Sequence, residues 1–302
     1  MLAARLLMDQ GIHIEAVTFD SPFFNVNAGK KAAEEIGIPW RAVDFTEDIL
    51  LLLENPPSGF GKNMNPCIDC HAAMFRRLRE LAQIEGHDFI FSGEVVGQRP
   101  MSQNRGSLNR VRNLSGTADI LLRPLSAKIL PPTPVEEAGL VDREKLLDLN
   151  GRGRTRQLEL AAQYGFSFIP APAGGCLLTD PGYSMRLRVL KENGLLTAEN
   201  AGMIRYGRMF LLRGAVGLAG RTKRENESIR ETGYGCLVDI KGVPSPLGVL
   251  LGNVNRENLS LLASIVASYT KLPGPFTAVS PHGEFTTDKI DVQERDRYTV
   301  IL

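Results

Sequence analysis

The chain has 302 residues, of which 43% are apolar and 23% are charged, and its net charge is +1. This length and composition predict a globular protein of two domains, and the near-neutral charge excludes a uniformly basic, polyanion-binding surface. Four cysteines in a chain of this length do not form a disulfide framework, and the sequence shows neither a secretory segment nor a long apolar run. We therefore expect a cytoplasmic protein with reduced thiols and no membrane partner.

The first part of the chain alternates helical and strand patterns, which is typical of an α/β fold with a parallel sheet. The expected helix over 46–54 has Thr46 as its N-cap and is stopped by Pro56 and Pro57. The other elements, in chain order, are a helix over 2–10, a strand over 12–19, a helix over 27–37, strands over 38–45, 87–91 and 120–125 around a helix over 71–84, and two helical patterns between 135 and 163.

The last part of the chain has a different pattern of helices and strands, which predicts a small α+β domain. Its expected elements are a helix over 184–193, strands over 210–213, 236–240 and 248–251, a helix over 259–269, and closing strands over 276–279 and 298–302. The expected domains are therefore residues 1–190 and residues 195–302.

Three cysteines form the most informative pattern. Cys67 and Cys70 stand three residues apart in GFGKNMNPCIDCH, and Cys176 lies far downstream in PAPAGGCLLTDP, where glycines allow the backbone to fold closely around a bound object. Three soft ligands on two segments predict a metal centre with one open position. Asp69, between the first two cysteines, is a candidate general acid or base, although a carboxylate at a helix start is an equally good reading.

The spacing alone leaves the type of centre open. An iron–sulfur cluster held by Cys67, Cys70 and Cys176 competes with a zinc site that adds His71 or Cys236 as a fourth ligand. A redox dithiol and a haem attachment site of the type CxxCH are weaker alternatives. Cys236 itself reads as a buried structural residue, and His13, His87 and His282 show no ligand spacing.

Two strand ends are candidates for nucleotide binding. One is the loop SGEVVGQ after the strand over 87–91, with Ser92, Gly93, Glu94 and Gln98; the other is the end of the first strand, with Thr18 and Phe19. Local groups of basic residues predict contacts with a phosphate backbone in spite of the neutral net charge. The residues proposed for RNA binding are Lys62, Arg76, Arg105, Arg208, Arg221, Lys223 and Arg224.

Five segments in a fixed order carry a resemblance to a known family. GFGKNMNPCIDCH, SGEVVGQRPMSQ, LLRPLSAKILPP, GLVDREKL and PAGGCLLTDP resemble the PP-loop ATPases that thiolate tRNA uridines, nearest to 4-thiouridine synthetases without a rhodanese domain. The match covers most of residues 1–190. The C-terminal part resembles, more loosely, the RNA-binding domain of NFACT proteins.

The resemblance implies a parallel sheet of the PP-loop type whose first strand is missing here, and an enzyme that uses ATP with Mg²⁺ to adenylate a uridine carbonyl before sulfur replaces the oxygen. It also implies a 4Fe-4S cluster on Cys67, Cys70 and Cys176, with Zn²⁺ as the alternative. The implied partners are tRNA and a sulfur donor, either free sulfide or a cysteine desulfurase; a homodimer is compatible with the sequence.

One feature of the family is missing from the sequence, since no SGGxDS loop for the pyrophosphate of ATP occurs in it. We expect that the start codon has been assigned too late, and that the 302-residue chain as written is a poor ATPase. The alternative function is a non-catalytic RNA-binding or metal-binding module that has lost nucleotide activation. A weaker alternative is a thiouracil desulfidase, which would need no ATP.

Overall fold

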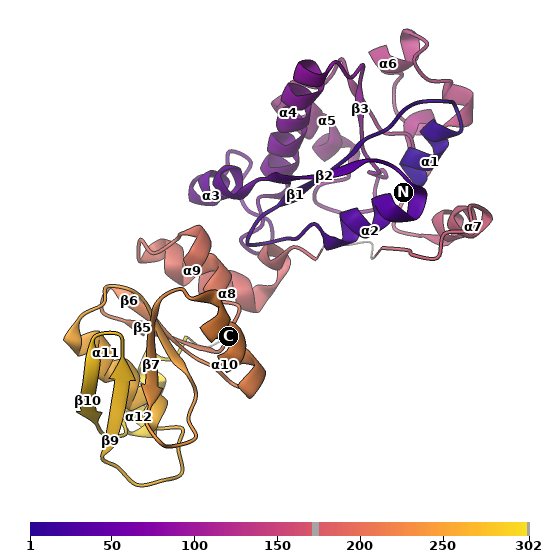
Figure 1. Ribbon diagram of the computed structural model, residues 1–302. Helices are drawn as coiled ribbons and strands as arrows, with labels where there is room; N and C mark the ends of the chain where they lie inside the picture. Colours follow the sequence, from indigo (N-terminus) through magenta and orange to yellow (C-terminus); the bar gives the residue numbers. More distant parts are fainter. Residues whose placement is uncertain (171–174, 301–302) are drawn as a thin grey trace. The chain divides into compact units, whose positions relative to one another are not determined.

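The computed structural model describes residues 1–170 and 175–300, and the chain divides into two compact units, Met1–Cys176 and Leu177–Leu302. Figure 1 traces both units. Among the helices of the described residues, none combines the length and the apolar character that a membrane crossing requires.

The first unit is an α/β structure with two short parallel strand pairs (Figure 1). β1 pairs with β2 from Ala16 opposite Trp40 to Asp20 opposite Asp44, and β3 pairs with β4. Its elements are α1 (Leu2–Met8), β1 (Ala16–Asp20), α2 (Asn27–Ile36), β2 (Trp40–Asp44), α3 (Thr46–Glu54), α4 (Cys67–Glu85), β3 (Ile90–Phe91), α5 (Arg105–Ser115), β4 (Leu121–Leu122), η1 (Ala127–Ile129), α6 (Pro134–Glu137), η2 (Arg143–Lys145) and α7 (Thr155–Gln163).

The long helix α4 is anchored by its apolar face. Ala72, Phe75 and Ala82 of α4 are buried with Val111 of α5 and Leu121 of β4 in one hydrophobic cluster. Burial of this face excludes water from several large side chains at once, and this is the main source of stability for a helix with so many charged residues. The start of α4, where the cysteines lie, is therefore fixed to the sheet.

Two helix starts in this unit differ from the sequence prediction. The N-cap of α3 is Phe45 and not Thr46; the backbone N–H of Thr46 is instead held by the carboxylate of Asp44 at 3.0 Å. α4 begins at Cys67 and not at residue 71, because the carbonyl of Pro66 accepts a hydrogen bond from the backbone N–H of Cys70 at 2.8 Å. Both cysteines of the CxxC pair thus belong to the first turn of a helix.

The second unit contains a six-stranded antiparallel sheet in the order β10-β9-β7-β8-β6-β5. Its core lies between the sheet and α11, and it includes Phe210, Val238 and Leu262. The elements are η3 (Leu177–Thr179), α8 (Pro181–Glu192), α9 (Ala198–Met203), β5 (Arg208–Leu212), β6 (Ala215–Ala219), α10 (Lys223–Thr232), β7 (Cys236–Ile240), β8 (Gly248–Gly252), α11 (Arg256–Ala267), β9 (Phe276–Ser280), β10 (Gly283–Thr287) and α12 (Val292–Tyr298).

The boundary between the units lies earlier than the sequence predicts, so α8 belongs to the second unit. Arg186 of α8 is buried, and its guanidinium donates hydrogen bonds to the carbonyls of Ile204 at 2.6 Å and Gly207 at 2.8 Å. Tyr183 of the same helix donates to the carbonyl of Ala201 at 2.7 Å. These bonds fasten α8 to the loop that enters β5.

The expected strand over 298–302 is wrong at its start, because Tyr298 is the last residue of α12. Thr299 forms an isolated antiparallel bridge with Phe210, and residues 301–302 lie outside the described part of the chain. The α12 helix begins at a clear cap, since Asp291 accepts a hydrogen bond from the backbone N–H of Gln293 at 2.8 Å. This cap supports a helix where apolar periodicity alone is weak.

Candidate functional site

The structure brings the three predicted cysteine ligands into one electrostatic neighbourhood. Cys70 is buried, whereas Cys67 and Cys176 are half-buried. Burial raises the pKa of the Cys70 thiol, and the charges of Cys176 and Cys67 raise it further. Gly175, just before Cys176, has a φ of 69°, a backbone conformation that favours glycine. The four residues before it, which belong to the PAPAGGC motif, lie outside the described residues.

A buried asparagine supports the first cysteine. Asn65 donates a hydrogen bond from its side-chain amide to the sulfur of Cys67 at 3.1 Å, and its amide oxygen accepts from the backbone N–H of Asn63 at 3.0 Å. Gly61 packs against this amide so closely that a Cβ there would lie 2.4 Å from the nitrogen of Asn65. The glycine-rich approach to the cysteines is therefore needed for close packing around Asn65.

Asp69 fastens the loop before α4 to the first turn of that helix. Its carboxylate is buried and accepts hydrogen bonds from the backbone N–H of Ser58 at 2.7 Å and from the Ser58 hydroxyl at 2.6 Å. Arg110 of α5 in turn donates to the same hydroxyl at 3.0 Å. The two oxygens of Asp69 each hold one bond, so the carboxylate has a positioning role in this structure.

A buried ionic network connects α4 with the loop after β3. Glu94 accepts hydrogen bonds from Arg123 at 2.7 Å and from Ser92 at 3.1 Å, and its second oxygen lies 3.0 Å from Nδ1 of His71. Burial alone would raise the pKa of Glu94, but the hydrogen bond with His71 and the charge of Arg123 lower it to about 2. Glu94 is therefore ionised, and the Nδ1–H of His71 is its donor.

This network decides where two predicted sites lie relative to each other. His71 directly follows Cys70 on α4, and Glu94 belongs to the loop proposed for nucleotide binding. The hydrogen bond between them places the start of that loop beside the cysteine helix. Gly93 is exposed and borders open space, so a ligand has access to the backbone at this point.

The other residues proposed for nucleotide binding are engaged in the fold. Phe19 is buried against Phe45, with the ring centroids 5.2 Å apart. The hydroxyl of Thr18 accepts a hydrogen bond from the indole N–H of Trp40 at 2.9 Å. Gln98 donates from its amide to Gln157 at 2.9 Å. Of this set, Glu94 contacts the cysteine helix directly, and Ser92 is connected to it through its hydrogen bond with Glu94.

The spacing of the sulfur atoms bears on the type of metal. Thiolates on one tetrahedral zinc ion lie about 3.8 Å apart. Within the described residues, the triple of ligand atoms that lie within 4.8 Å of one another belongs to Glu15, Glu85 and His87, and the three cysteines do not form such a triple. The hydrogen bond to Glu94 engages Nδ1 of His71 and leaves its Nε2 as the ring nitrogen that a metal would use. Cys236 is buried in the core of the second unit.

The basic residues proposed for RNA binding are distributed over both units. Arg76 donates to the carbonyl of Leu114 at 3.0 Å, and Arg208 lies over the ring of Tyr269 at 4.8 Å. Arg221 and Lys223 flank the start of α10, where Glu225 and Glu227 lie 3.9 and 3.8 Å away from them. Lys62, Arg76, Arg105, Arg221, Lys223 and Arg224 are exposed, and Arg208 is half-buried.

Sequence reasoning missed the supporting residues and one charged group. Ser58 lies outside the five resembling segments, and Asn65 and Arg123 lie inside two of them without being singled out; their roles arise from contacts within the fold. His87, which shows no ligand spacing in the sequence, lies beside Glu15 and Glu85 in space. Glu85 stands two residues before His87, and this short spacing is the sequence feature that could have indicated the group. Glu15 comes from a different part of the chain.

Comparisons of the chain with protein-family models, with curated proteins and with solved structures found no match.

Proposed function

We propose that this chain is a tRNA uridine sulfurtransferase of the PP-loop type. In this proposal ATP with Mg²⁺ activates a uridine carbonyl as an adenylate, and a sulfur species displaces AMP. The observation that carries the proposal is the convergence of Cys67, Cys70 and Cys176 from two distant segments. The sequence resemblance supplies the reaction, and the cysteine neighbourhood supplies a place for its sulfur chemistry.

We favour a cluster over a single zinc ion because all three proposed ligands are thiolates. A three-cysteine cluster spreads its thiolates over three irons, so it needs a wider spacing than the tetrahedral edge of zinc. When bound, such a cluster would supply one thiophilic iron position for a sulfur species. The N–H···S hydrogen bond from Asn65 to Cys67 is of the kind that tunes cluster thiolates.

The neighbouring residues give this site a fixed geometry. Asp69 holds the loop around Ser58 onto α4, and Glu94 holds the imidazole of His71 and the guanidinium of Arg123. Fixed geometry is valuable for a displacement reaction, because orientation of the reacting groups contributes a large part of the rate. Gly93 would present its backbone to the nucleotide.

The strand pairs of the first unit support the PP-loop type of sheet. Within the described residues, β1 pairs with β2 and β3 pairs with β4, both in parallel. Ala16, Val17, Ile90 and Phe91, from β1 and β3, line a common cavity of about 580 Å³. A shared cavity is expected if both pairs belong to one parallel sheet, as the resemblance implies.

Metal and sulfide analysis of protein purified without oxygen tests the cluster. We expect about four iron and four sulfide per chain with a brown chromophore. Cys67→Ala, Cys70→Ala and Cys176→Ala should each abolish the colour, whereas Cys236→Ala is the matched control and should keep it.

Equal loss in all four variants would contradict the three-ligand assignment. Stoichiometric zinc without colour would favour the second candidate, an RNA-binding or metal-binding module. The activity itself is tested by nucleoside mass spectrometry of tRNA after incubation with ATP, Mg²⁺ and sulfide; thiouridine that forms only with ATP supports the enzyme.

A further inference from the structure

We propose that Glu15, Glu85 and His87 form a second metal site, which binds a divalent first-row ion through two carboxylates and one imidazole. Glu15 precedes β1, Glu85 ends α4, and His87 precedes β3. Cys67 begins the same helix of 19 residues, so the proposed ion lies about 27 Å of helix length away from the cysteine site. The two sites are therefore independent.

One of the two distances within this group matches the edge of a tetrahedral metal site, and the other is slightly longer. Nε2 of His87 lies 3.4 Å from an oxygen of Glu85 and 3.9 Å from an oxygen of Glu15. Hydrogen bonds from nitrogen to oxygen are usually about 2.9–3.0 Å long. Nitrogen and oxygen ligands on one tetrahedral ion lie roughly 3.3–3.6 Å apart, because each is about 2.0–2.2 Å from the ion. The three ligand atoms all lie within 4.8 Å of one another.

Arg41 contacts both carboxylates, and at Glu85 it shares the Oε2 atom with His87. Its guanidinium bonds both oxygens of Glu85, and its Nε lies 3.0 Å from the Oε1 atom of Glu15. The hydrogen bonds from Arg41 lower the pKa of Glu85 and keep it charged. Oε2 of Glu15, the atom nearest His87, is not the atom that faces Arg41. Such a supporting partner is typical of ligating carboxylates.

The charge balance favours a cation. Two carboxylates and one guanidinium leave one negative charge when the imidazole is neutral, and a neutral imidazole is the form that binds metal. Carboxylates together with imidazole suit zinc and manganese. A divalent ion would neutralise the repulsion between Glu15 and Glu85 that Arg41 offsets only in part.

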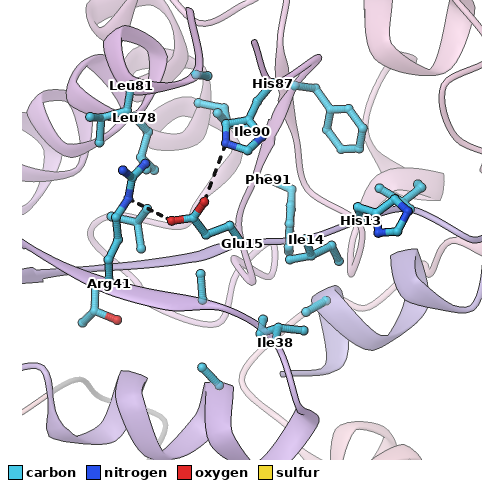
Figure 2. Close-up of a pocket in the computed structure, with 18 of the residues that line it drawn as sticks. His13, Ile14, Glu15, Ile38, Arg41, Leu78, Leu81, His87, Ile90 and Phe91 are labelled. Carbon is cyan, nitrogen blue, oxygen red and sulfur yellow. Dashed lines mark ion pairs between the residues drawn. The ribbon is translucent and has the colours of Figure 1, made fainter. Parts of the chain in front are cut away.

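Glu15 and His87 lie at the polar part of a cavity that is otherwise mainly apolar, and Glu85 is next to the lining residue Gly86. Figure 2 shows Glu15 between Arg41 and His87, with Leu78, Leu81 and Ile90 nearby. The side chains of Glu15, Glu85 and His87 are 31%, 28% and 45% exposed, so water has access to complete the coordination. An ion here would join the segment before β1 to the segment between α4 and β3.

Titration with Mn²⁺, followed by the electron paramagnetic resonance signal of the free ion, tests the site in the full chain. Mn²⁺ is suitable because thiolates are poor ligands for it, so the cysteines do not interfere. We expect one Mn²⁺ per chain, and an affinity lowered at least about tenfold by His87→Asn. His13→Asn is the matched control, because His13 lines the same cavity outside the group and should leave the affinity unchanged.

Glu85→Gln provides a second variant and should also lower the affinity at least about tenfold. Glu85→Gln also removes an ion pair with Arg41, so its thermal unfolding is measured to show that the variant is folded. If Glu85→Gln is unfolded, the test rests on the affinity of His87→Asn. Absence of stoichiometric binding in the native chain, or equal affinity in His87→Asn, would overturn the proposal.

Discussion

At the scale of single residues, Glu94 shows how burial and function are linked. A carboxylate that is 6% exposed is stable only with strong partners, and Arg123, Ser92 and His71 supply them. The same bonds fix the imidazole of His71 next to Cys70. The network therefore stabilises the fold and orients a side chain at the proposed site.

The lowered pKa of Glu94 predicts a stability that depends on pH. Its folded pKa of about 2 lies below the ordinary value of 4.5, so its contribution is present above pH 4.5 and is lost as the pH falls toward 2. Between pH 4.5 and 3 the loss is on the order of 2 kcal/mol. Glu94→Gln should lower the free energy of unfolding near pH 7, and its difference from the native chain should shrink in this acidic range.

Denaturant unfolding at several pH values measures this difference. Glu80→Gln is the matched control, since Glu80 lies on the surface of α4, and it should follow the native chain at every pH. A difference for Glu94→Gln that stays constant from pH 7 to pH 3 would contradict the role of the charged carboxylate.

At the scale of elements, the start of α4 depends on the loop before it. Asp69 accepts two bonds from Ser58, and an amide in its place can accept only the backbone bond. The Ser58 hydroxyl, which also accepts from Arg110, then has to turn away and loses a charged acceptor. Asp69→Asn should destabilise the first unit by about 1–3 kcal/mol and speed protease cleavage between residues 58 and 66. Ser58→Ala, which removes one of the two bonds, should show a smaller effect in the same direction.

This pair of variants also separates the two readings of Asp69. A positioning role predicts that loss of metal and loss of stability accompany each other in both variants. If Asp69→Asn keeps its stability and its metal content and loses only tRNA thiolation, the carboxylate acts as an acid or base in the reaction.

Sequence patterns predicted those elements whose apolar residues are large and periodic. The strand β7 was predicted with its exact bounds, because Cys236, Val238 and Ile240 alternate with less buried residues. The buried strand β6 was missed because AVGLA consists mainly of small residues. Gly217 is required there, since a Cβ would lie 2.8 Å from Leu262 of α11. Such a packing constraint is visible only when both elements are in place.

The helix α10 was missed for a different reason. Its sequence KRENESIRET buries a single apolar residue, Ile229, so it has almost no hydrophobic periodicity. The cap was nevertheless readable, because Thr222 and Glu225 have the spacing of a capping box. The Thr222 hydroxyl accepts from the backbone N–H of Glu225 at 3.2 Å, and the Glu225 carboxylate accepts from the N–H of Arg221, one residue before the cap, at 2.6 Å. The sequence identifies the cysteines as candidate ligands from their chemistry. The roles of Asn65, Arg123 and Glu15 depend on contacts that only the folded structure shows.

At the scale of the whole molecule, the proposed function assigns tRNA binding to local basic groups of a nearly neutral chain. Arg221, Lys223 and Arg224 stand together at the start of α10, and all three are exposed. Residues 205–224 contain no Asp or Glu, which suggests a strongly positive potential. Glu225 and Glu227 lie near two of the three basic residues and weaken this positive potential. Replacing these three residues therefore measures how much their charge contributes to tRNA binding.

Replacing Arg221, Lys223 and Arg224 together by alanine should weaken tRNA binding by the full chain and reduce its salt dependence. Each lost phosphate contact lowers the slope of log K against log salt by roughly 0.7–0.9, so three contacts correspond to a change of about 2–3. Arg256, Lys271 and Arg297, also exposed in the second unit, make the matched triple control. If the affinity and the slope stay equal to those of the native chain, α10 does not contact the tRNA. Lys62, Arg76, Arg105 and Arg208 then become the remaining candidates, because salt-dependent tRNA binding needs cationic side chains that displace counterions from the phosphates.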